Sequence, residues 1–458
     1  MRQRCYLISL LSTILISGCT TSPITDSWSD PRPLGRDLTT FKPPTINQSR
    51  NKFVEQREQF APPRSKLKLK DAMSAALLNN PQLAIYAYEI RASEARTLQT
   101  SLWPNPEISI EAENIGGSGS YENIDSLEVT AAFSQTFLTA GKLKKAVRHA
   151  NLQSQVAAWE YEIQRIALLT NVRQQFVDVL LAQSRFELLK ESQELSQQVF
   201  DLVNRRAEAG DIPAVEAIRA QVPLARASVE LERATYQLAS ERIQLAGYWG
   251  EPNAVFDVAD GTLEELYPLP EISELVALIN QNPRIAKQTV EIAQQDAAIR
   301  LEKANATPDI TATAGLRYFN DENDSAFVLG LSLPLAIFDR NQGNIWEARF
   351  NRAKSLEAQS AAEVLVSVEL GRAYQQLSQT HHVVLSLKNK VIPPAQEAYN
   401  ATKVGFEQGN LRYLDVLDAR QALVESQIEY LEVLGSYHRT VAQIEGLIGQ
   451  SLRSITNE

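Results

Sequence analysis

The organisation of the chain follows from the stretch Asn79-Asn80-Pro81-Gln82-Leu83, which recurs as Gln281-Asn282-Pro283-Arg284-Ile285, 202 residues further on (Pro81 to Pro283). A second marker, Arg206–Asp211, recurs at Gly405–Asn410 with an offset of 199 residues (Gly210 to Gly409). Repeats this long are typical of a duplicated domain and not of a solenoid built from short units.

Both halves show the same predicted order of helix, two strands, very long helix, glycine turn and helix. We therefore predict two repeats, residues 66–260 and 261–450, followed by a short tail, 451–458. The segment 140–209 would extend about 100 Å if it were fully helical, far more than the helices of a compact domain. Pro223, Pro393 and Pro394 are expected to kink or restart helices.

Apolar residues follow a heptad pattern in the helix after Gly210, which is typical of coiled-coil packing. The first row comprises Val215, Ile218, Val222, Ala225, Val229, Tyr236, Ala239, Ile243 and Ala246. A second row comprises Leu224, Leu231, Leu238 and Leu245. The helix after Gly409 repeats the first row as Leu414, Leu417, Val424, Ile428, Leu431 and Ala442. A helix with two apolar rows must contact neighbours on two sides, as in a cylinder of helices.

Four segments alternate apolar with small or polar residues and are predicted to form two hairpins. The first pairs residues 106–115 with 126–137, and the second pairs 309–319 with 326–338. Each segment has about the 9–11 residues that a strand needs to cross a bilayer at a tilt. Two water-soluble hairpins on a helical body are the alternative at this point.

Four strands cannot close a membrane barrel, because the smallest such barrels have eight. Open strand edges are not tolerated in lipid, so strands that span must be shared among several chains. Three chains of four strands would give a twelve-stranded barrel with room for a lumen, and the same threefold arrangement would close the helices into a tunnel. The predicted fold class is therefore mainly α with a small transmembrane β part.

The N-terminus is predicted to be a targeting segment. Arg2 and Arg4 precede the apolar run 7–16, which is too short to span a membrane as a helix. The run ends in Ile16-Ser17-Gly18-Cys19, which resembles the lipobox of bacterial lipoproteins. We expect a signal peptide over residues 1–18 and lipidation of Cys19. The proline-rich stretch 19–65 is expected to be a strap leading from the lipid to the folded body.

The composition excludes several classes of function. The chain has 45 Lys and Arg against 55 Asp and Glu, a net charge of −10, which disfavours binding to nucleic acid. Two Cys, four His and two Met leave little for a zinc or transition-metal site. We find no catalytic Ser, Cys or His constellation and no phosphate-binding glycine loop. The sequence therefore predicts no enzyme, no cofactor and no resident metal.

Several strings resemble the TolC-like outer membrane factor family of outer membrane efflux proteins. They are Leu102-Trp103-Pro104-Asn105-Pro106-Glu107-Ile108, Phe338-Asp339-Arg340-Asn341-Gln342-Gly343 and Leu414-Asp415-Val416-Leu417-Asp418-Ala419-Arg420. The branch that the chain is most similar to comprises the CzcC- and CusC-like lipoprotein components of heavy-metal efflux pumps. The resemblance covers roughly residues 66–450.

This resemblance implies a homotrimeric duct in the cell outer membrane, lipid-anchored and extending into the periplasm. It would act with an inner-membrane RND pump and a periplasmic adaptor (membrane fusion protein), conducting heavy-metal cations outward without making or breaking bonds. The turns at Gly210 and Gly409 resemble the periplasmic tips where the adaptor docks. Glycine suits such turns because it tolerates positive φ after a helix.

The resemblance also implies a narrow periplasmic entrance formed by three residues. Asp415 and Asp418 match positions whose carboxylates ring this entrance, and Phe406 matches a constricting aromatic. Two Asp at i, i+3 share one helix face, and a threefold ring of them would attract cations. The alternative reading of Asp415 and Asp418 is two solvated residues favoured by a helix N-terminus, and Phe406 could serve packing alone.

Alternative functions differ in cargo or in class. A drug-efflux duct or a type I secretion duct would have the same architecture, and the sequence does not select the cargo, the cognate pump or the resting state of the entrance. A coiled-coil scaffold lipoprotein is the alternative of another class. It would have no reason to carry four strands of bilayer length with an apolar face.

Overall fold

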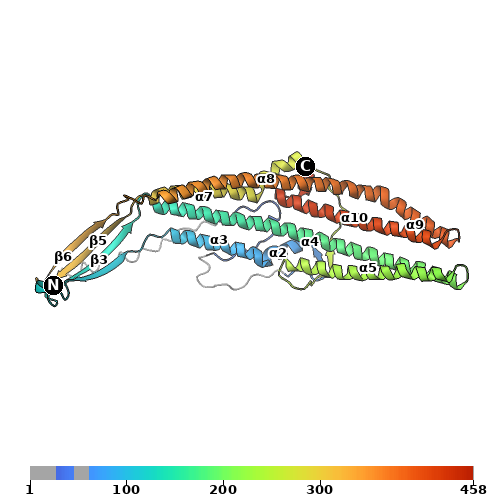
Figure 1. Cartoon of the computed structure of the whole chain (residues 1–458), viewed down its shortest axis with the longest axis horizontal. Helices are drawn as coiled ribbons and strands as arrows, with labels where there is room; N and C mark the ends of the chain where they lie inside the picture. The colour runs from blue at the N-terminus through green and yellow to red at the C-terminus, as the bar shows by residue number, and fades with distance from the viewer. Residues whose placement is uncertain (1–26, 46–60, 457–458) are drawn as a thin grey trace. The chain divides into compact units, whose positions relative to one another are not determined.

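The computed structural model describes residues 27–45 and 61–456, and the fold is mainly helical (Figure 1). The chain divides into two compact units. One comprises the residues up to Ser29, Glu89–Ala158 and Lys287–Ser360, and the other comprises Asp30–Tyr88, Trp159–Ala286 and Ala361–Glu458. The expected signal peptide and Cys19 lie outside the described residues.

The long helices and strands follow one another in the predicted order in each half, with short elements that were not predicted before them. The first half contains β1 (Lys66–Lys68), α2 (Leu69–Asn79), α3 (Pro81–Thr100), β2 (Glu107–Glu113), β3 (Glu128–Phe137), α4 (Lys142–Glu208), α5 (Ala214–Gly247) and β4 (Val258–Asp260). The second half contains α6 (Ile272–Leu278), α7 (Pro283–Asn305), β5 (Ile310–Phe319), β6 (Asp324–Ser332), α8 (Gln342–Ser386), α9 (Ile392–Glu407), α10 (Tyr413–Ile448) and α11 (Leu452–Thr456).

The very long helix predicted over 140–209 is present as α4, with 67 residues. In the second half, a π-helical turn at Leu387–Val391 separates α8 from α9, which starts just before Pro393 and Pro394. The restart predicted there is therefore confirmed. Pro223 behaves differently, since it lies inside α5 and the helix continues through it.

The four long strands form one sheet in the order β2-β3-β5-β6, with every neighbouring pair antiparallel. All four strands are shorter than predicted, β2 and β6 the most. β2 ends at Glu113 because Asn114 adopts a left-handed φ of 63°. β6 ends at Ser332 instead of residue 338, and Pro334, two residues further on, lacks the N–H that a ladder requires.

The register gives the sheet two different faces, because directly paired residues of antiparallel strands point to the same side. The apolar face comprises Ile108, Ile110, Ala112, Val129, Ala131, Phe133, Phe137, Ile310, Ala312, Ala314, Leu316, Tyr318, Phe327, Leu329 and Leu331, with Gln135 and Ser325 as its polar members. The opposite face comprises Glu107, Ser109, Glu111, Glu113, Glu128, Thr130, Ser134, Thr136, Thr311, Thr313, Arg317, Asp324 and Ser332, together with Phe319, Val328 and several Gly and Ala. We call these the apolar face and the polar face.

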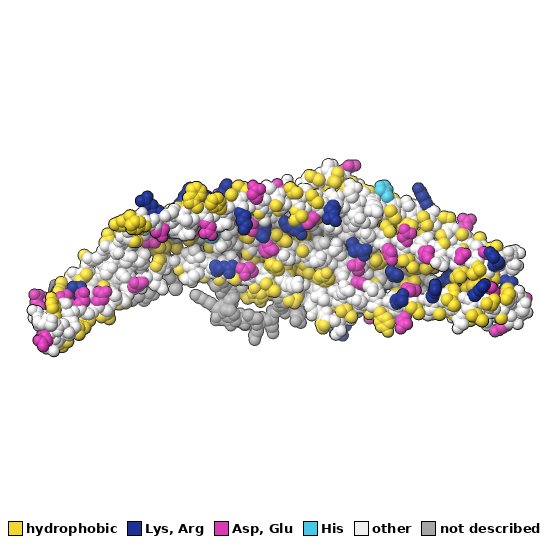
Figure 2. All heavy atoms as spheres, in the orientation of Figure 1, with side chains coloured by type: hydrophobic (Ala, Val, Ile, Leu, Met, Phe, Trp, Pro, Cys, Tyr) yellow, Lys and Arg dark blue, Asp and Glu magenta, His cyan; other side chains and the backbone are white. Residues whose placement is uncertain are grey.

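Large side chains of the apolar face are exposed in the single chain. Ile108 is 80% exposed and Phe327 is 86% exposed. Figure 2 shows a line of acidic side chains along the strands. In the described part of the chain, no helix combines the length and apolarity needed to cross a membrane.

The second unit is built around a helical core. One cluster of buried residues joins α6, α8 and α10 through Leu275, Leu370, Tyr437 and Ile444, among others. Residues 30–45 of the proline-rich strap belong to this unit and are held in place by hydrogen bonds. Buried Arg165 donates to the carbonyl oxygens of Leu34 and Arg32, at 3.0 and 3.2 Å.

The two apolar rows of α5 have different environments. Leu238 and Leu245 of the second row are buried, together with Ala220, Ala227 and Ala234. In the first row, six side chains are between 48% and 69% exposed: Val215, Ile218, Val222, Val229, Tyr236 and Ile243. The chain itself therefore covers one side of α5 and leaves an apolar row on the other, which we call the α5 stripe.

Candidate entrance at the helix turns

The turns after α4 and α9 have the same hydrogen-bonded structure. Asp211 N–H donates to the carbonyl oxygen of Arg206 at 3.0 Å, and Asn410 N–H donates to that of Gly405 at 2.8 Å. These are the six-to-one bonds of a Schellman motif, which satisfies carbonyl groups left open at a helix end. The equal position of the two bonds in the two halves reproduces the 199-residue offset of the sequence markers.

Gly210 and Gly409 occupy the left-handed position of these motifs, with φ of 83° and 79°. A side chain at such a φ is strained, which is why glycine stands at both turns. This geometry accords with the turns predicted there, and a docking role for them stays a prediction.

One contact joins the two turns. The Arg206 guanidinium donates a hydrogen bond of 2.8 Å to the carbonyl oxygen of Phe406. The same guanidinium lies over the Phe406 ring, 5.0 Å from its centre. Since this carbonyl belongs to the last turn of α9, Arg206 supplies a cationic cap to the C-terminus of that helix.

Phe406 is buried, with 3% of its surface exposed, and does not project from the turn. It packs in a cluster with Val203, Tyr399 and Tyr413 beneath the turns. Its ring centre lies 6.2 Å from that of Tyr413. Within the single chain, the aromatic expected to constrict an entrance therefore serves as packing support.

Asp415 is engaged in local structure at the start of α10. Its Oδ2 accepts the Arg412 backbone N–H at 2.9 Å, and its Oδ1 lies 3.4 Å from the Arg412 guanidinium. This arrangement stabilises the helix N-terminus, as the alternative reading from the sequence proposed. The Asp415 side chain is 32% exposed, so one edge of the carboxylate still faces outward.

Asp418 lies one turn further along α10 and is exposed. Within the described residues, no hydrogen bond or ion pair engages its carboxylate. The corresponding positions of the first repeat are Glu216 and Arg219, which pair with each other at 2.9 Å. The two turns therefore share a backbone but differ in charge, and only the second leaves a carboxylate unpaired.

A half-buried arginine lies behind the second turn. Arg420 on α10 donates to the Ser192 hydroxyl at 3.0 Å. Burial lowers the pKa of Arg420, although nearby Tyr413 and Tyr399 oppose the shift, and burial raises the pKa of the Tyr413 phenol.

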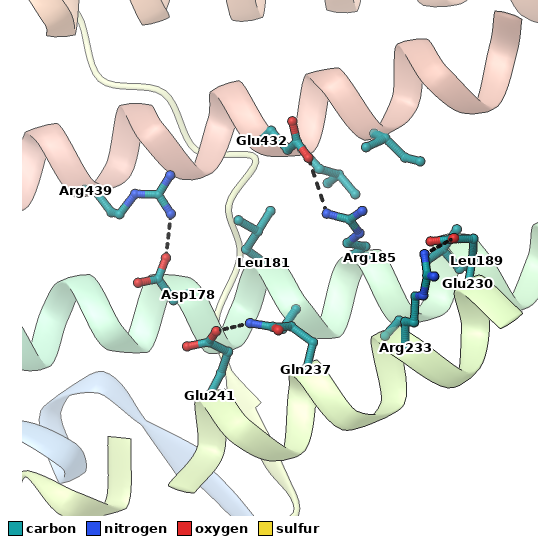
Figure 3. A pocket seen from close by; sticks show the side chains of 14 residues that line it. Asp178, Leu181, Arg185, Leu189, Glu230, Arg233, Gln237, Glu241, Glu432 and Arg439 are labelled. Carbon is teal, nitrogen blue, oxygen red and sulfur yellow. Dashed lines mark hydrogen bonds and ion pairs between the residues drawn. The ribbon is translucent and has the colours of Figure 1, made fainter. Parts of the chain in front are cut away.

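A groove of about 470 Å³ runs between α4, α5 and α10 (Figure 3). Figure 3 shows three pairs of oppositely charged side chains pointing toward one another. These are Arg439 with Asp178, Arg185 with Glu432 at 3.3 Å, and Arg233 with Glu230 at 2.8 Å. The remaining carboxylate of the lining, Glu241, accepts hydrogen bonds from Gln175 and Gln237. Within residues 27–45 and 61–456, no group of three or more His, Cys, Asp or Glu side chains could hold a metal ion.

Sequence reasoning missed Arg206. Its counterpart in the second repeat is Gly405, so the duplication offers no matching residue that would draw attention to it. A basic residue in the last helical turn is the one available signal, because cations are favoured there.

Known proteins resemble the chain over most of its length. The family model described as outer membrane efflux protein matches residues 72–251 and 275–450. The cobalt-zinc-cadmium resistance protein CzcC of Cupriavidus metallidurans is 31% identical over 384 residues, covering 84% of this chain and 90% of CzcC. The cation efflux system protein CusC of Escherichia coli is 22% identical over 402 residues, covering 82% and 84%. A crystal structure of CusC superposes with a TM-score of 0.67 at 17% identity, covering 88% of this chain and 96% of CusC.

Proposed function

The chain belongs to the outer membrane efflux protein family, and from this premise we propose that it forms the outer-membrane duct of a tripartite heavy-metal efflux system. As an outer-membrane protein extending into the periplasm, it would conduct cations passively from the periplasm to the outside. The relatives named for cobalt, zinc and cadmium resistance and for cation efflux support this cargo.

The main support for the proposal is the four-stranded sheet with its apolar face and its polar face. An apolar face of exposed Ile, Leu and Phe suits lipid, and a polar face rich in Glu and Thr suits a water-filled lumen. Within the described chain, β2 and β6 each pair on one side only. Three copies would join these edges into a closed barrel of twelve strands, and the helices of the three copies would continue it as a coiled-coil tunnel.

The α5 stripe supports the same assembly. A row of six half-exposed apolar side chains along one helix is more than a surface helix ordinarily leaves uncovered. Its heptad spacing suits a helix of a second copy. A homotrimer would therefore bury the apolar side chains of the α5 stripe, which are exposed in the single chain.

The entrance would lie at the second turn of each copy. Asp418, exposed and unpaired in the described chain, would supply most of the charge that attracts cations. Asp415 would contribute its outward edge while stabilising α10, and Phe406 would hold the turn from beneath. The Gly210 and Gly409 turns would face a periplasmic adaptor, which connects the duct to an inner-membrane RND pump.

Lipidation of Cys19 would fix the chain to the outer membrane. The described part of the strap lies against the folded body, through Arg165 and through a 2.8 Å hydrogen bond from Leu34 N–H to the Gly449 carbonyl oxygen. A lipid at Cys19 would thus be joined to the body through a strap whose residues 30–45 lie against it.

Cation entry into sealed vesicles tests this function. Full-length protein is reconstituted into liposomes that contain a dye quenched by Co²⁺, and Co²⁺ is added outside. We expect dye quenching that protein-free vesicles lack. The Arg206→Ala variant is measured in parallel, since loosening its turn prevents a closed entrance from hiding the duct. Vesicles that stay sealed with both proteins would contradict the proposal, and equal entry of a large uncharged dye would favour a drug duct.

A further inference from the structure

Two carboxylates face each other across β2 and β3. Glu113 pairs directly with Glu128 in the register, so both side chains lie on the polar face. Like charges directly opposite in an antiparallel pair destabilise the sheet unless a third group bridges them.

Arg317 on β5 is that third group. Its two terminal nitrogens lie 2.9 Å from Glu113 and 2.8 Å from Glu128. Its Nε donates to the hydroxyl of Thr130 at 2.8 Å, and Thr130 is the residue directly opposite Arg317 in the β3–β5 register. One guanidinium thus binds two carboxylates and one hydroxyl, and joins three strands.

Three more carboxylates stand on the polar face. Glu107 and Glu111 on β2 are exposed, and no hydrogen bond or ion pair engages them within the described residues. Asp324, at the start of β6, is also exposed and accepts a hydrogen bond from the Ser325 backbone N–H at 2.8 Å. The polar face therefore carries five carboxylates and one guanidinium, which binds the two carboxylates nearest to the loop that joins β2 to β3.

We propose that Arg317 sets the charge selectivity of the membrane part of the duct. This inference rests on the proposed trimer, in which the polar face lines the lumen. Arg317 neutralises half of the charge that Glu113 and Glu128 would present to passing ions. The remaining attraction of cations comes from Glu107, Glu111 and Asp324, which no basic side chain of the described residues pairs. Arg317 acts here as a specificity-determining residue and not as a binding site.

The reversal potential of single channels under a KCl gradient tests this role. Arg317→Gln should raise the cation-to-anion permeability ratio about twofold or more, because a single added charge acting through water over about 10 Å gives about that factor and the trimer would carry three. Arg317→Gln combined with Glu128→Gln restores the original net charge and should return the ratio to that of the unchanged protein. Arg233→Gln, which breaks an ion pair on α5, is the matched control and should leave the ratio unchanged.

A conducting Arg317→Gln channel with an unchanged ratio would overturn the inference and leave the proposed function intact. If Arg317→Gln alone does not form channels, the Glu113→Gln variant tests the inference instead, because it keeps the ion pair between Arg317 and Glu128. Its ratio should fall about twofold, and an unchanged ratio would overturn the inference. Absence of current from the unchanged protein would instead contradict the duct itself.

Discussion

The guanidinium of Arg206, at the end of the first long helix, caps the main-chain carbonyl of Phe406 at the end of the corresponding helix of the second repeat, at 2.8 Å. The duplicated turns are therefore not independent. One arginine, present in the first repeat only, fixes the backbone from which the acidic helix α10 starts.

Arg206→Ala should loosen the second turn. It removes a charge-assisted hydrogen bond and a cation–π contact, which together should cost about 1–2 kcal/mol of local stability. Hydrogen exchange of the amides at 404–412 should become about tenfold faster or more. Arg205→Ala, one residue earlier and exposed, is the control and should leave these amides unchanged. Equal protection in both variants would show that the turn does not depend on Arg206.

Substitutions of Asp415 and Asp418 should have separate effects, the first on the stability of the protein and the second on the ion selectivity of the channel. Asp415→Ala removes the acceptor of the Arg412 N–H and should cost about 0.5–1 kcal/mol at the start of α10. Asp418→Ala should leave stability unchanged but lower the cation preference of the channel. Thermal unfolding and bilayer recording on both variants measure the two effects, and a preference that survives both substitutions would refute the acidic entrance.

Gly409→Ala and Gly371→Ala should change stability in opposite directions. Gly409 has a φ of 79°, where a side chain is strained, so its substitution should cost about 1 kcal/mol. Gly371 lies inside α8, and no neighbouring side chain lies within 4 Å of the position that an added methyl group would take, so alanine should gain about 0.5–1 kcal/mol. Denaturant unfolding of the two variants gives both values. A neutral Gly409→Ala would mean that the turn readily adopts another conformation.

Charges placed in the α5 stripe should block assembly without unfolding the chain. Ile218→Glu with Tyr236→Glu puts two carboxylates on side chains that are 66% and 69% exposed in the single chain. Sedimentation in detergent should then show single chains with unchanged circular dichroism. The control, Thr235→Glu, adds a charge beside the stripe and should sediment as the unchanged protein does. Normal assembly of the double variant would place the contact between copies elsewhere.

Ionisation of Glu264 should contribute to the pH dependence of the stability of the fold. Partial burial alone would raise the pKa of Glu264, but hydrogen bonds from Lys388 and Tyr430 outweigh it and lower the pKa. A lowered folded-state pKa stabilises the protein at neutral pH, and this contribution is lost as the pH falls through that pKa. Glu264→Gln should therefore lower the Tm at pH 7 and lower it less below about pH 4.3. A Tm difference that is constant from pH 7 to pH 3.5 would contradict this.

The sequence predicts the repetitive features of the fold well. Alternation identified the four long strands but not the three-residue strands β1 and β4, and the absence of glycine and proline over 142–208 accompanies the longest described helix. Strand ends were less predictable, because β2 stops where Asn114 takes a positive φ and β6 stops before Pro334. These are local backbone preferences that periodicity does not register.

The candidate sites were predicted less completely, since they depend on contacts between distant residues. The burial of Phe406 follows from packing against residues of other helices, such as Val203. The Arg317 contacts follow from a strand register that places it beside Glu113 and Glu128, 204 and 189 residues earlier (113 and 128 to 317). Neither contact has a local sequence signal.

The central claim is that copies of this chain complete one cation-conducting duct, and single-channel recording of the full-length protein in a planar bilayer tests it most directly. The account predicts discrete current steps. Under a salt gradient, their reversal potential should be shifted toward the equilibrium potential of the cation. A bilayer that stays silent after the protein has inserted, or steps that favour anions, would contradict it.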